Sequence, residues 1–302
     1  MRLMKAVTFL SVKGGVGKTT LAVNTAAMLA DRVGGSEKVL VVDLDAQASA
    51  TVYILGHKKQ RGFEESNHTV YGLLSGGVEA RDCVVNVSEH TDKWSSRLYL
   101  VPGDSRVTEL ERRIVAESAA GGYGWLYIVR RALEKLSGEG FSYVFIDPPA
   151  TLGVLSEAAL AASRYFILPI VPDDFGRTSF RLFASSFFSG VAMKIRTELG
   201  TLPLCGGIVF NKVKSNTAME KIANSIVEEV HKSKLYGKYP IPLYKTRLHE
   251  YIAYTKSLEE HVPLWNIKEK KKHENAIKEF EEYFDEFYEY VVRDKAAAGG
   301  QV

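Results

Sequence analysis

Residues 13–20 read Lys-Gly-Gly-Val-Gly-Lys-Thr-Thr, a run of residue types that can bind the phosphates of a nucleotide. Its three glycines let the backbone turn tightly and bring N–H groups onto phosphate oxygens. Lys18 adds a positive charge at the β- and γ-phosphates, and the Thr19 hydroxyl is a natural Mg²⁺ ligand. We expect the nucleotide contacts to come from Gly14, Gly15, Val16, Gly17, Lys18, Thr19 and Thr20.

The segments on either side of this loop have the patterns that a phosphate loop requires. The apolar run Ala6–Leu10 is typical of a buried strand, and Thr20–Ala30 has the pattern of a helix. The unusual residue is Lys13, five positions before Lys18, because a plain phosphate loop does not need a second lysine.

Two further apolar runs end in carboxylates. Val39–Val42 leads into Asp43, and Tyr143–Ile146 leads into Asp147. Because the carboxyl ends of parallel strands meet at one edge of a sheet, both carboxylates should lie near the phosphate loop. We expect Asp43 and Asp147 to hold Mg²⁺ together with the Thr19 hydroxyl. For Asp43, a cap at the strand end is the alternative interpretation.

Taken together, these segments resemble the ParA/MinD family of deviant Walker A P-loop ATPases, most closely its ParA-type DNA-partition members. The matching segments are the loop with its second lysine, Asp43-Leu-Asp-Ala-Gln47, and Asp147-Pro-Pro-Ala-Thr-Leu-Gly153. The resemblance spans roughly residues 5–265. It implies ATP and Mg²⁺ as cofactors. It also implies catalytic roles for Lys13, which acts on the partner subunit's nucleotide, for Lys18, and for Asp45, which orients the attacking water.

The resemblance also suggests which residues recognise the base. The strand Gly207–Phe210 ends at Asn211, whose amide is expected to pair with adenine; a strand-end cap is the alternative. The loop that follows Pro242 is expected to pack over the adenine.

The alternation of apolar runs and helical patterns predicts an α/β fold, a P-loop NTPase-like, mostly parallel twisted sheet with helices on both faces. We expect one domain over residues 1–294, a polar surface loop at 57–68 and a flexible tail at 295–302. The predicted strands are Ala6–Leu10, Val39–Val42, Leu98–Val101, Tyr143–Ile146, Tyr165–Val171 and Gly207–Phe210. The predicted helices are Thr19–Arg32, Arg106–Glu117, Leu126–Leu136, Leu152–Ala162, Ser179–Leu199, Ala218–His231 and Asn275–Val292.

Composition helps to decide which branch of the family the chain resembles. The net charge is +3, so any nucleic-acid surface must be local. The two cysteines, Cys83 and Cys205, are isolated, which suits a reducing cytosol and argues against the branches that bind or assemble metal clusters. No apolar run reaches the length of a membrane span.

Two segments distinguish a DNA surface from a membrane surface. The helix Ala276–Val292 has an apolar stripe and an acidic opposite face; because anionic lipid repels acidic residues, we interpret it as packed on the domain. Basic residues gather after Asn211, in the region that the resemblance assigns to DNA. The DNA contacts expected from it are Lys212, Lys214, Lys245 and Arg247.

The sequence therefore predicts an ATPase that dimerises when ATP is bound, binds DNA non-specifically and partitions plasmids or chromosomes. The resemblance implies a centromere-binding partner of the ParB type and a cytoplasmic, nucleoid-associated location. A MinD-like ATPase that positions other factors on a membrane surface is the alternative, and a small-molecule kinase is a weaker one.

Overall fold

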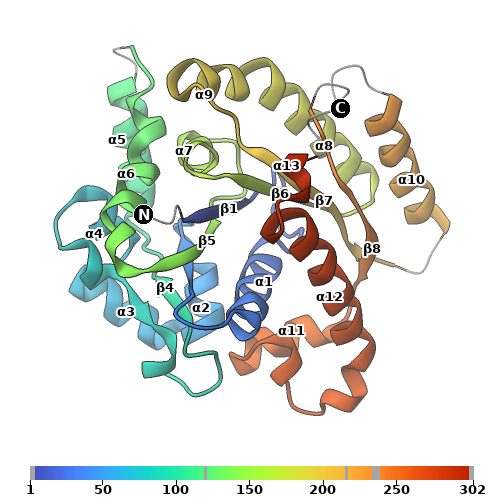
Figure 1. Ribbon diagram of the computed structural model, residues 1–302, viewed down its shortest axis with the longest axis horizontal. Helices are drawn as coiled ribbons and strands as arrows, with labels where there is room; N and C mark the ends of the chain where they lie inside the picture. The colour runs from blue at the N-terminus through green and yellow to red at the C-terminus, as the bar shows by residue number, and fades with distance from the viewer. Residues whose placement is uncertain (1–3, 119–120, 215–216, 233–238, 299–302) are drawn as a thin grey trace.

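The computed structural model describes residues 4–118, 121–214, 217–232 and 239–298. These residues form an eight-stranded sheet in the order β3-β4-β2-β5-β1-β6-β7-β8 (Figure 1). Neighbouring strands are parallel except for β3, which pairs antiparallel with β4. The strands are β1 (Lys5–Phe9), β2 (Lys38–Asp43), β3 (Val85–Asn86), β4 (Leu98–Val101), β5 (Phe141–Asp147), β6 (Tyr165–Ile170), β7 (Leu204–Val213) and β8 (Leu243–His249).

Helices cover both faces of this sheet (Figure 1). The α-helices are α1 (Lys18–Arg32), α2 (Ser49–Leu55), α3 (His57–Ser66), α4 (Val70–Ser75), α5 (Val107–Ser118), α6 (Ile128–Lys135), α7 (Val154–Ala162), α8 (Asp174–Ser186), α9 (Ala192–Leu199), α10 (Thr217–Lys232), α11 (Ile252–Glu260), α12 (Glu274–Phe287) and α13 (Lys295–Ala298). Single turns are η1 (Ala80–Cys83), η2 (Val87–Glu89), η3 (Gly124–Tyr127), η4 (Ser137–Glu139), η6 (Leu264–Asn266) and η7 (Lys270–His273), and the π-helical turns are η5 (Phe187–Val191) and η8 (Tyr288–Val292).

The near-continuous apolar strands explain why both faces must be covered. Successive residues of a strand point to opposite faces of the sheet. In β2, Val39 and Val41 pack in the core that contains α1, α2, α11 and α12. Leu40 and Val42 pack in the core that contains α4, α5, α6 and α7. The predicted fold class is therefore confirmed, since strands buried on both faces are typical of parallel sheets.

The six predicted strands are all present, but two predictions about other segments were wrong. Residues expected to form a loop at 57–68 form α3, because Lys, Gln, Arg and Glu are good helix formers although they are polar. Gln60 is buried, and the Phe63 ring packs edge-on against His90, which anchors this helix. The strand β8 and the helix α11 follow Pro242 where a loop was expected.

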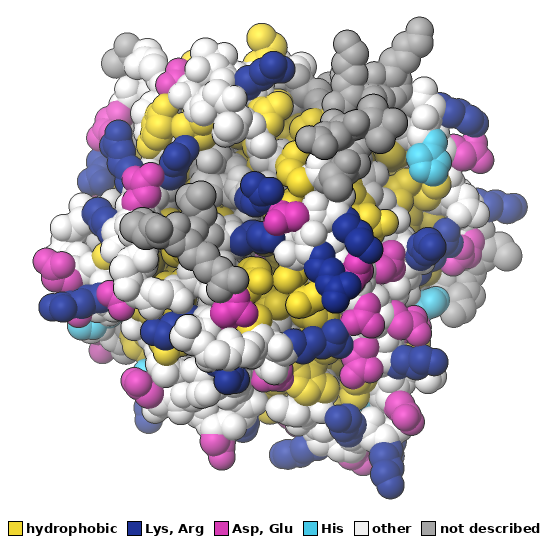
Figure 2. All heavy atoms as spheres, in the orientation of Figure 1, with side chains coloured by type: hydrophobic (Ala, Val, Ile, Leu, Met, Phe, Trp, Pro, Cys, Tyr) yellow, Lys and Arg dark blue, Asp and Glu magenta, His cyan; other side chains and the backbone are white. Residues whose placement is uncertain are grey.

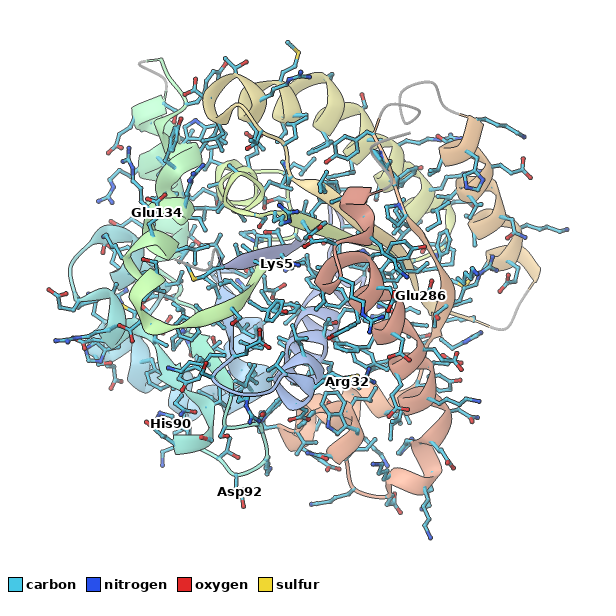
Figure 3. The ribbon with its side chains drawn as sticks, in the orientation of Figure 1. Lys5, Arg32, His90, Asp92, Glu134 and Glu286 are labelled. Atoms are coloured by element: carbon cyan, nitrogen blue, oxygen red, sulfur yellow. The ribbon has the colours of Figure 1, made fainter. Side chains whose placement is uncertain are left out.

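The segment expected to form a tail at 295–302 begins as the short helix α13. Ala296 is buried and Lys295 pairs with Glu289, so this part of the chain packs on the domain. Residues 299–302 lie outside the described residues. Just before α13, Asp294 accepts a hydrogen bond from Lys5 at 2.9 Å, which ties the C-terminal helices to β1 (Figure 3).

The edge strand β8 is covered by α12. Both oxygens of Glu286 accept backbone hydrogen bonds, from the N–H groups of Lys245 and Thr246, each at 2.8 Å (Figure 3). Glu279 accepts another from the His249 N–H at 3.0 Å. Because these N–H groups are occupied, the sheet cannot extend through another strand at this edge.

The apolar stripe of α12 faces inward, as the sequence indicated. Its buried members are Ile277, Phe280, Tyr283, Phe284, Phe287 and, in the turn that follows, Val291. The Tyr283 hydroxyl is bonded to Thr25 of α1 at 3.1 Å, and Arg32 lies over the Phe284 ring at 4.6 Å. The interpretation of this helix as packed on the domain is confirmed. Among the described residues, no helix combines the length and the apolar character needed to cross a bilayer.

Candidate functional site

The loop between β1 and α1 has the backbone geometry of a phosphate cradle. Gly15 and Gly17 adopt φ values of 78° and 87°, in the left-handed region that glycine tolerates. A Cβ at Gly17 would also collide with the amide nitrogen of Asn211. No side chain caps the start of α1, so the first N–H groups of this helix are available to an anion.

Lys18 and Thr19 both reach the same carboxylate at the end of β5. The Lys18 Nζ lies 2.5 Å from Asp147 Oδ1, and the Thr19 hydroxyl donates to Asp147 Oδ2 at 2.7 Å. Lys18 is 6% exposed and Asp147 is 0% exposed. The loop, the lysine and the carboxylate therefore meet at one buried point, at the carboxyl edge of the sheet.

Asp43 lies beside Asp147 because the two residues are register partners in β2 and β5. Asp43 is fully buried and accepts hydrogen bonds from Thr51 N at 2.8 Å and Thr51 Oγ1 at 2.7 Å. Burial, with the neighbouring Asp147 charge, raises the pKa of Asp43 to about 7. Two adjacent buried carboxylates are an environment that favours a bound cation.

Asp45 follows β2 and lies at the same edge of the sheet, where it is half-buried. Its Oδ1 accepts a hydrogen bond from Gln47 N at 3.0 Å, which fixes the turn before α2. On the other side of the turn is Glu111 of α5, whose pKa is raised by burial and by the charge of Asp45. Glu111 also accepts a hydrogen bond from the Leu155 N–H at the start of α7.

Lys13 pairs with a different carboxylate from the one that Lys18 contacts. Its Nζ lies 3.3 Å from Asp173 Oδ2 and 5.3 Å from the centre of the Phe175 ring, at the start of α8. The Phe175 side chain is 74% exposed. Lys13 thus lies at the protein surface beside the phosphate loop, while Lys18 provides the charge inside it.

Asn211 supports the phosphate loop from the end of β7. Its Nδ2 donates to the Val16 carbonyl at 2.8 Å, and the residue is 5% exposed. This contact matches the alternative interpretation, in which Asn211 holds the strand end and the neighbouring loop. The pairing of its amide with adenine stays a prediction.

A hollow of about 160 Å³ adjoins Asn211 on the α11 side of the loop. Its walls come from α1, from the end of β7 and from α11, and include Thr20, Lys212, Tyr251, Tyr254 and Thr255. The Tyr254 hydroxyl is buried and has no hydrogen-bond partner within the described parts of the chain.

Pro242 lies beside the middle of β7, and its contact with adenine stays a prediction. The Pro242 carbonyl accepts a hydrogen bond from Ile208 N at 2.8 Å, in the first half of β7. The phosphate loop adjoins the other end of β7, at Asn211. Because β7 and β8 are parallel, the chain returns to the nucleotide edge only after His249, and it is α11 that lines the hollow there.

The four basic residues expected to touch DNA have different surroundings. Lys212 lines the hollow beside the loop, and Lys214 forms an exposed ion pair with Glu250 at 3.4 Å. The Arg247 guanidinium contacts Glu220 of α10 and lies 5.8 Å from the centre of the Phe210 ring. The Lys245 side chain is exposed, and it has no carboxylate partner within the described ranges.

Several residues of this site could not be named from the sequence. Asp173, Phe175, Tyr251, Tyr254 and Glu111 come from segments that carry no motif. Tyr251 and Tyr254 closely follow the end of β8, so their place after a strand end was the available signal. The contact of Asp173 with Lys13 spans 160 positions and had no local signal.

The residues at this edge fit ATP and Mg²⁺. The open glycine loop and the first turn of α1 suit phosphate groups, and a Cβ at Gly14 or Gly15 would meet nothing within 4 Å. The Thr19 hydroxyl, Asp43 and Asp147 offer oxygen ligands, which Mg²⁺ prefers. Within the described parts of the chain, no group of three His, Cys, Asp or Glu side chains is arranged to hold a metal alone.

Comparison with known proteins identifies the family. A family model described as an AAA domain matches residues 4–189. The chromosome-partitioning ATPase Soj of Treponema pallidum is 27% identical over 226 residues, which cover 75% of this chain and 77% of Soj. The virulence plasmid ParA family protein pGP5-D of Chlamydia psittaci is 28% identical over 235 residues, which cover 77% of this chain and 78% of pGP5-D.

A solved structure agrees on the fold. A variant of McdA from Cyanothece, in complex with ATP, superimposes with a TM-score of 0.70 and 19% identity, over 95% of each chain. With the loop, the two strand-end carboxylates and the second lysine in the expected places, this chain belongs to the ParA/MinD family of P-loop ATPases.

Proposed function

We propose that this protein hydrolyses ATP, forms a homodimer around the bound nucleotide, and in that state binds DNA without sequence preference to partition a plasmid or chromosome. The observation that carries the proposal is the position of Lys13, which lies beside the phosphate loop, is about one-third exposed, and pairs with Asp173 rather than with Asp147. A lysine placed in this way can reach a nucleotide held by a second subunit across a shared interface.

The nucleotide-binding residues suit phosphoryl transfer to water. With ATP bound, Lys18 would pair with phosphate oxygens, and Asp147 and the Thr19 hydroxyl would hold the metal ion. Bound Mg²⁺ supplies charge neutralisation at the phosphates. Asp45, half-buried beside Asp43 at this edge, orients the attacking water. Positioning and charge account for most of the catalysis in this class of reaction.

The hollow between the phosphate loop and α11 is the proposed place for the adenine. Tyr251 and Tyr254 contribute aromatic surface on which a base can pack. Asn211 acts indirectly, because it holds the Val16 carbonyl and so the shape of the loop.

The DNA surface is proposed to include Lys214 and Lys245. Both side chains are exposed, and the single ion pair of Lys214 with Glu250 is at the surface, where such pairs contribute little. Figure 2 shows that Lys and Arg are interspersed with Asp and Glu over β8 and α12. This face of a monomer therefore mixes basic with acidic side chains, and dimerisation would place two copies of Lys214 and Lys245 on one surface.

The names of two relatives support a role in DNA partition, since one is a chromosome-partitioning ATPase and the other a plasmid ParA family protein. We propose a centromere-binding protein of the ParB type as the partner that stimulates turnover, and a cytoplasmic, nucleoid-associated location. The membrane-surface alternative is disfavoured because the apolar stripe of α12, which would face the lipid, is buried in the domain.

Gel-shift titrations with and without a slowly hydrolysed ATP analogue, on two unrelated duplexes, test the proposal. We expect binding only with the analogue and equal affinity for both duplexes. The affinity should fall with salt at a log–log slope of about −0.9 for each phosphate contacted. Absence of binding in the ATP state, or a strong preference for one duplex, would contradict it. Sedimentation with anionic liposomes and ATP then tests the membrane-surface alternative.

A further inference from the structure

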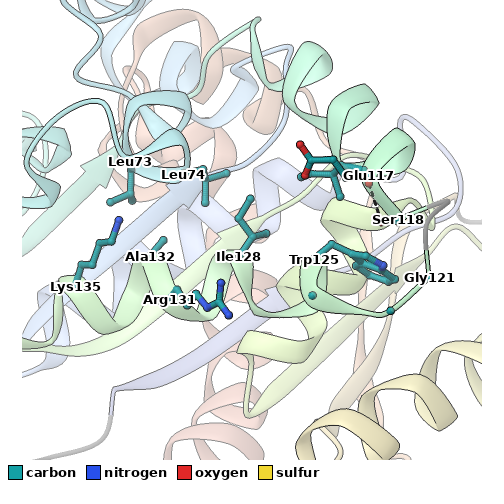
Figure 4. A pocket seen from close by; sticks show the side chains of 13 residues that line it. Leu73, Leu74, Glu117, Ser118, Gly121, Trp125, Ile128, Arg131, Ala132 and Lys135 are labelled. Carbon is teal, nitrogen blue, oxygen red and sulfur yellow. Dashed lines mark hydrogen bonds between the residues drawn. The ribbon is translucent and has the colours of Figure 1, made fainter.

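A second hollow, of about 560 Å³, lies between α4, α5 and α6 (Figure 4). It is on the face of the sheet opposite α1, and the proposed nucleotide site does not use it. Leu74 of α4, Ile114 of α5, and Ile128 and Ala132 of α6 form its apolar floor, and Trp125 closes one end. We call this hollow the α5–α6 groove.

The rim of the α5–α6 groove carries positive charge. Arg131 and Lys135 are exposed on α6 and line the groove, and within the described residues neither has a carboxylate partner. Glu117 is the acidic residue on the rim, and its Oε1 pairs with Nε of Arg113 on the same helix at 3.9 Å. The rim therefore presents two uncompensated cations above an apolar floor, which is complementary to an acidic, amphipathic ligand.

Apolar surface continues beyond the hollow itself. Tyr123 is 39% exposed and its ring packs edge-on against Trp125, with the ring centres 6.4 Å apart. Val115 on α5 is 53% exposed. A site for a small molecule encloses most of its ligand, whereas exposed apolar side chains beside an open groove are typical of a protein–protein contact.

We propose that the α5–α6 groove docks a helical segment of a partner protein that carries apolar side chains on one face and Asp or Glu beside them. The apolar side chains would pack on Leu74, Ile114 and Ile128, and the acidic ones would pair with Arg131 and Lys135. A groove between helices that receives one face of an amphipathic helix is a recurrent mode of peptide recognition.

The geometry of α5 connects this groove with the catalytic edge. Ser118 lines the groove at the last residue of α5, and Glu111 lies two turns earlier along the same face of the helix. The Glu111 carboxylate accepts a hydrogen bond from the Leu155 N–H at the start of α7. Its Oε1 lies so close to Gly153 that a Cβ added there would be 2.6 Å away. Gly153 follows the Asp147 strand end, so a partner that shifts α5 also shifts the segment behind the proposed metal ligand. This coupling rests on the proposed function, but the docking does not.

Docking is tested by selecting random displayed peptides of about 16 residues on the immobilised full chain and measuring the affinity of the enriched peptides by fluorescence anisotropy. We expect them to combine Asp or Glu with large apolar residues. The double variant Arg131→Glu, Lys135→Glu should bind them about tenfold or more weakly. The matched control, Lys58→Glu with Arg61→Glu on α3, makes the same change in net charge elsewhere and should bind them as the parent does.

Three outcomes would overturn the docking proposal: no peptide enriched, enriched peptides that are basic, or equal affinity for the parent and the groove variant. DNA binding that is lost in the groove variant but kept in the control would reassign the rim to nucleic acid.

The coupling is tested by adding a selected peptide during ATP hydrolysis. The peptide should change kcat of the parent and leave kcat of the groove variant unaltered. A peptide that docks on a chain without ATPase activity would refute the proposed function and leave the docking intact. An active enzyme whose kcat ignores a bound peptide would refute the coupling alone.

Discussion

Lys18 and Asp147 form a buried ion pair, with Lys18 Nζ 2.5 Å from Asp147 Oδ1. The other oxygen of the same carboxylate accepts the Thr19 hydroxyl at 2.7 Å. The Asp147 carboxylate thus contacts both Lys18, which is proposed to bind phosphate, and the Thr19 hydroxyl, which is proposed to bind a metal ion. Because removing one partner of a buried pair leaves an uncompensated charge, substitutions here affect the free energy of unfolding as well as the chemistry.

Thr19→Ala tests the metal role without breaking that ion pair. The variant loses one hydrogen bond, about 1 kcal/mol of stability, and should still fold. Its ATP turnover should fall by about 100-fold or more, since the metal ion loses a ligand. Steady-state ATPase assays and thermal unfolding separate the two effects, with Thr197→Ala on the exposed side of α9 as the matched control. Turnover close to that of the parent would remove Thr19 from the metal site.

Lys18→Ala should lower both the ATP turnover and the melting temperature. It leaves Asp147 buried without its cation, at a cost of about 3–5 kcal/mol in the free energy of unfolding, and it removes the charge that faces the phosphates. Normal hydrolysis by this variant would contradict the assignment of the loop.

Lys13→Ala should separate nucleotide binding from dimerisation. The pair with Asp173 is about one-third exposed on both sides, so its loss should change stability by no more than about 1 kcal/mol. The variant should bind a fluorescent ATP analogue as a monomer and fail to dimerise with ATP, as seen by light scattering. Lys256→Ala on α11 serves as a surface-lysine control. An ATP-dependent dimer of Lys13→Ala would show that the lysine does not act on the partner's nucleotide.

Asp45→Asn should stop the chemistry and spare binding. Asparagine keeps the oxygen that receives the Gln47 N–H, so the turn before α2 should survive. The amide cannot act as a base, and the variant should accumulate as an ATP-bound dimer with a greatly reduced kcat. Single-turnover assays would report this directly. If kcat stays unchanged, Asp43 becomes the next candidate.

The part of this site that follows from sequence is the part encoded locally. An apolar strand, a glycine turn and a helix are contiguous in residues 6–30, and the sheet then brings Asp43 and Asp147 to the same edge through parallel pairing. These residues could be predicted because each follows its own strand, and the order of strands did not need to be known.

Residues whose place depends on tertiary packing could not be predicted in this way. The sequence does not indicate that Glu220 is the partner of Arg247, but β8 pairs with β7 and brings Arg247 against Glu220 of α10. Strand pairing also places Pro242 beside Ile208 rather than beside the strand end at Asn211. The helix α3 buries only Gln60, so its sequence has no apolar stripe. A polar segment without such a stripe is typical of a loop. In each case, packing between distant segments decided the outcome.

Glu157 should make stability depend on pH. Burial in α7 raises its pKa above the ordinary value of 4.5, and the charge of Lys194, 3.2 Å away, offsets this only in part. The native state therefore holds this proton more tightly than the unfolded chain does, so stability falls as pH rises from 4.5 through the native pKa. Glu157→Gln removes the titration. Its melting temperature relative to the parent should be higher at about pH 8 than at about pH 5. Glu134→Gln, on an exposed position of α6, should show no such trend, and a constant difference for Glu157→Gln would disprove the assignment.

Lys245 and Arg247 should behave differently although both were predicted to contact DNA. Arg247 donates to Asn224 at 2.7 Å and contacts Glu220, so Arg247→Gln should lower the melting temperature by loosening β8 from α10. Its effect on the salt slope of DNA binding should be small.

The double variant Lys214→Gln, Lys245→Gln should fold normally and weaken DNA binding equally on unrelated duplexes. It should also reduce the log–log salt slope by about 0.9 for each phosphate that is no longer neutralised. Gel-shift titrations over a range of salt concentrations, with the slowly hydrolysed ATP analogue present, measure both variants. A changed slope for Arg247→Gln with none for the lysine pair would place the DNA surface on α10 rather than along the ends of β7 and β8.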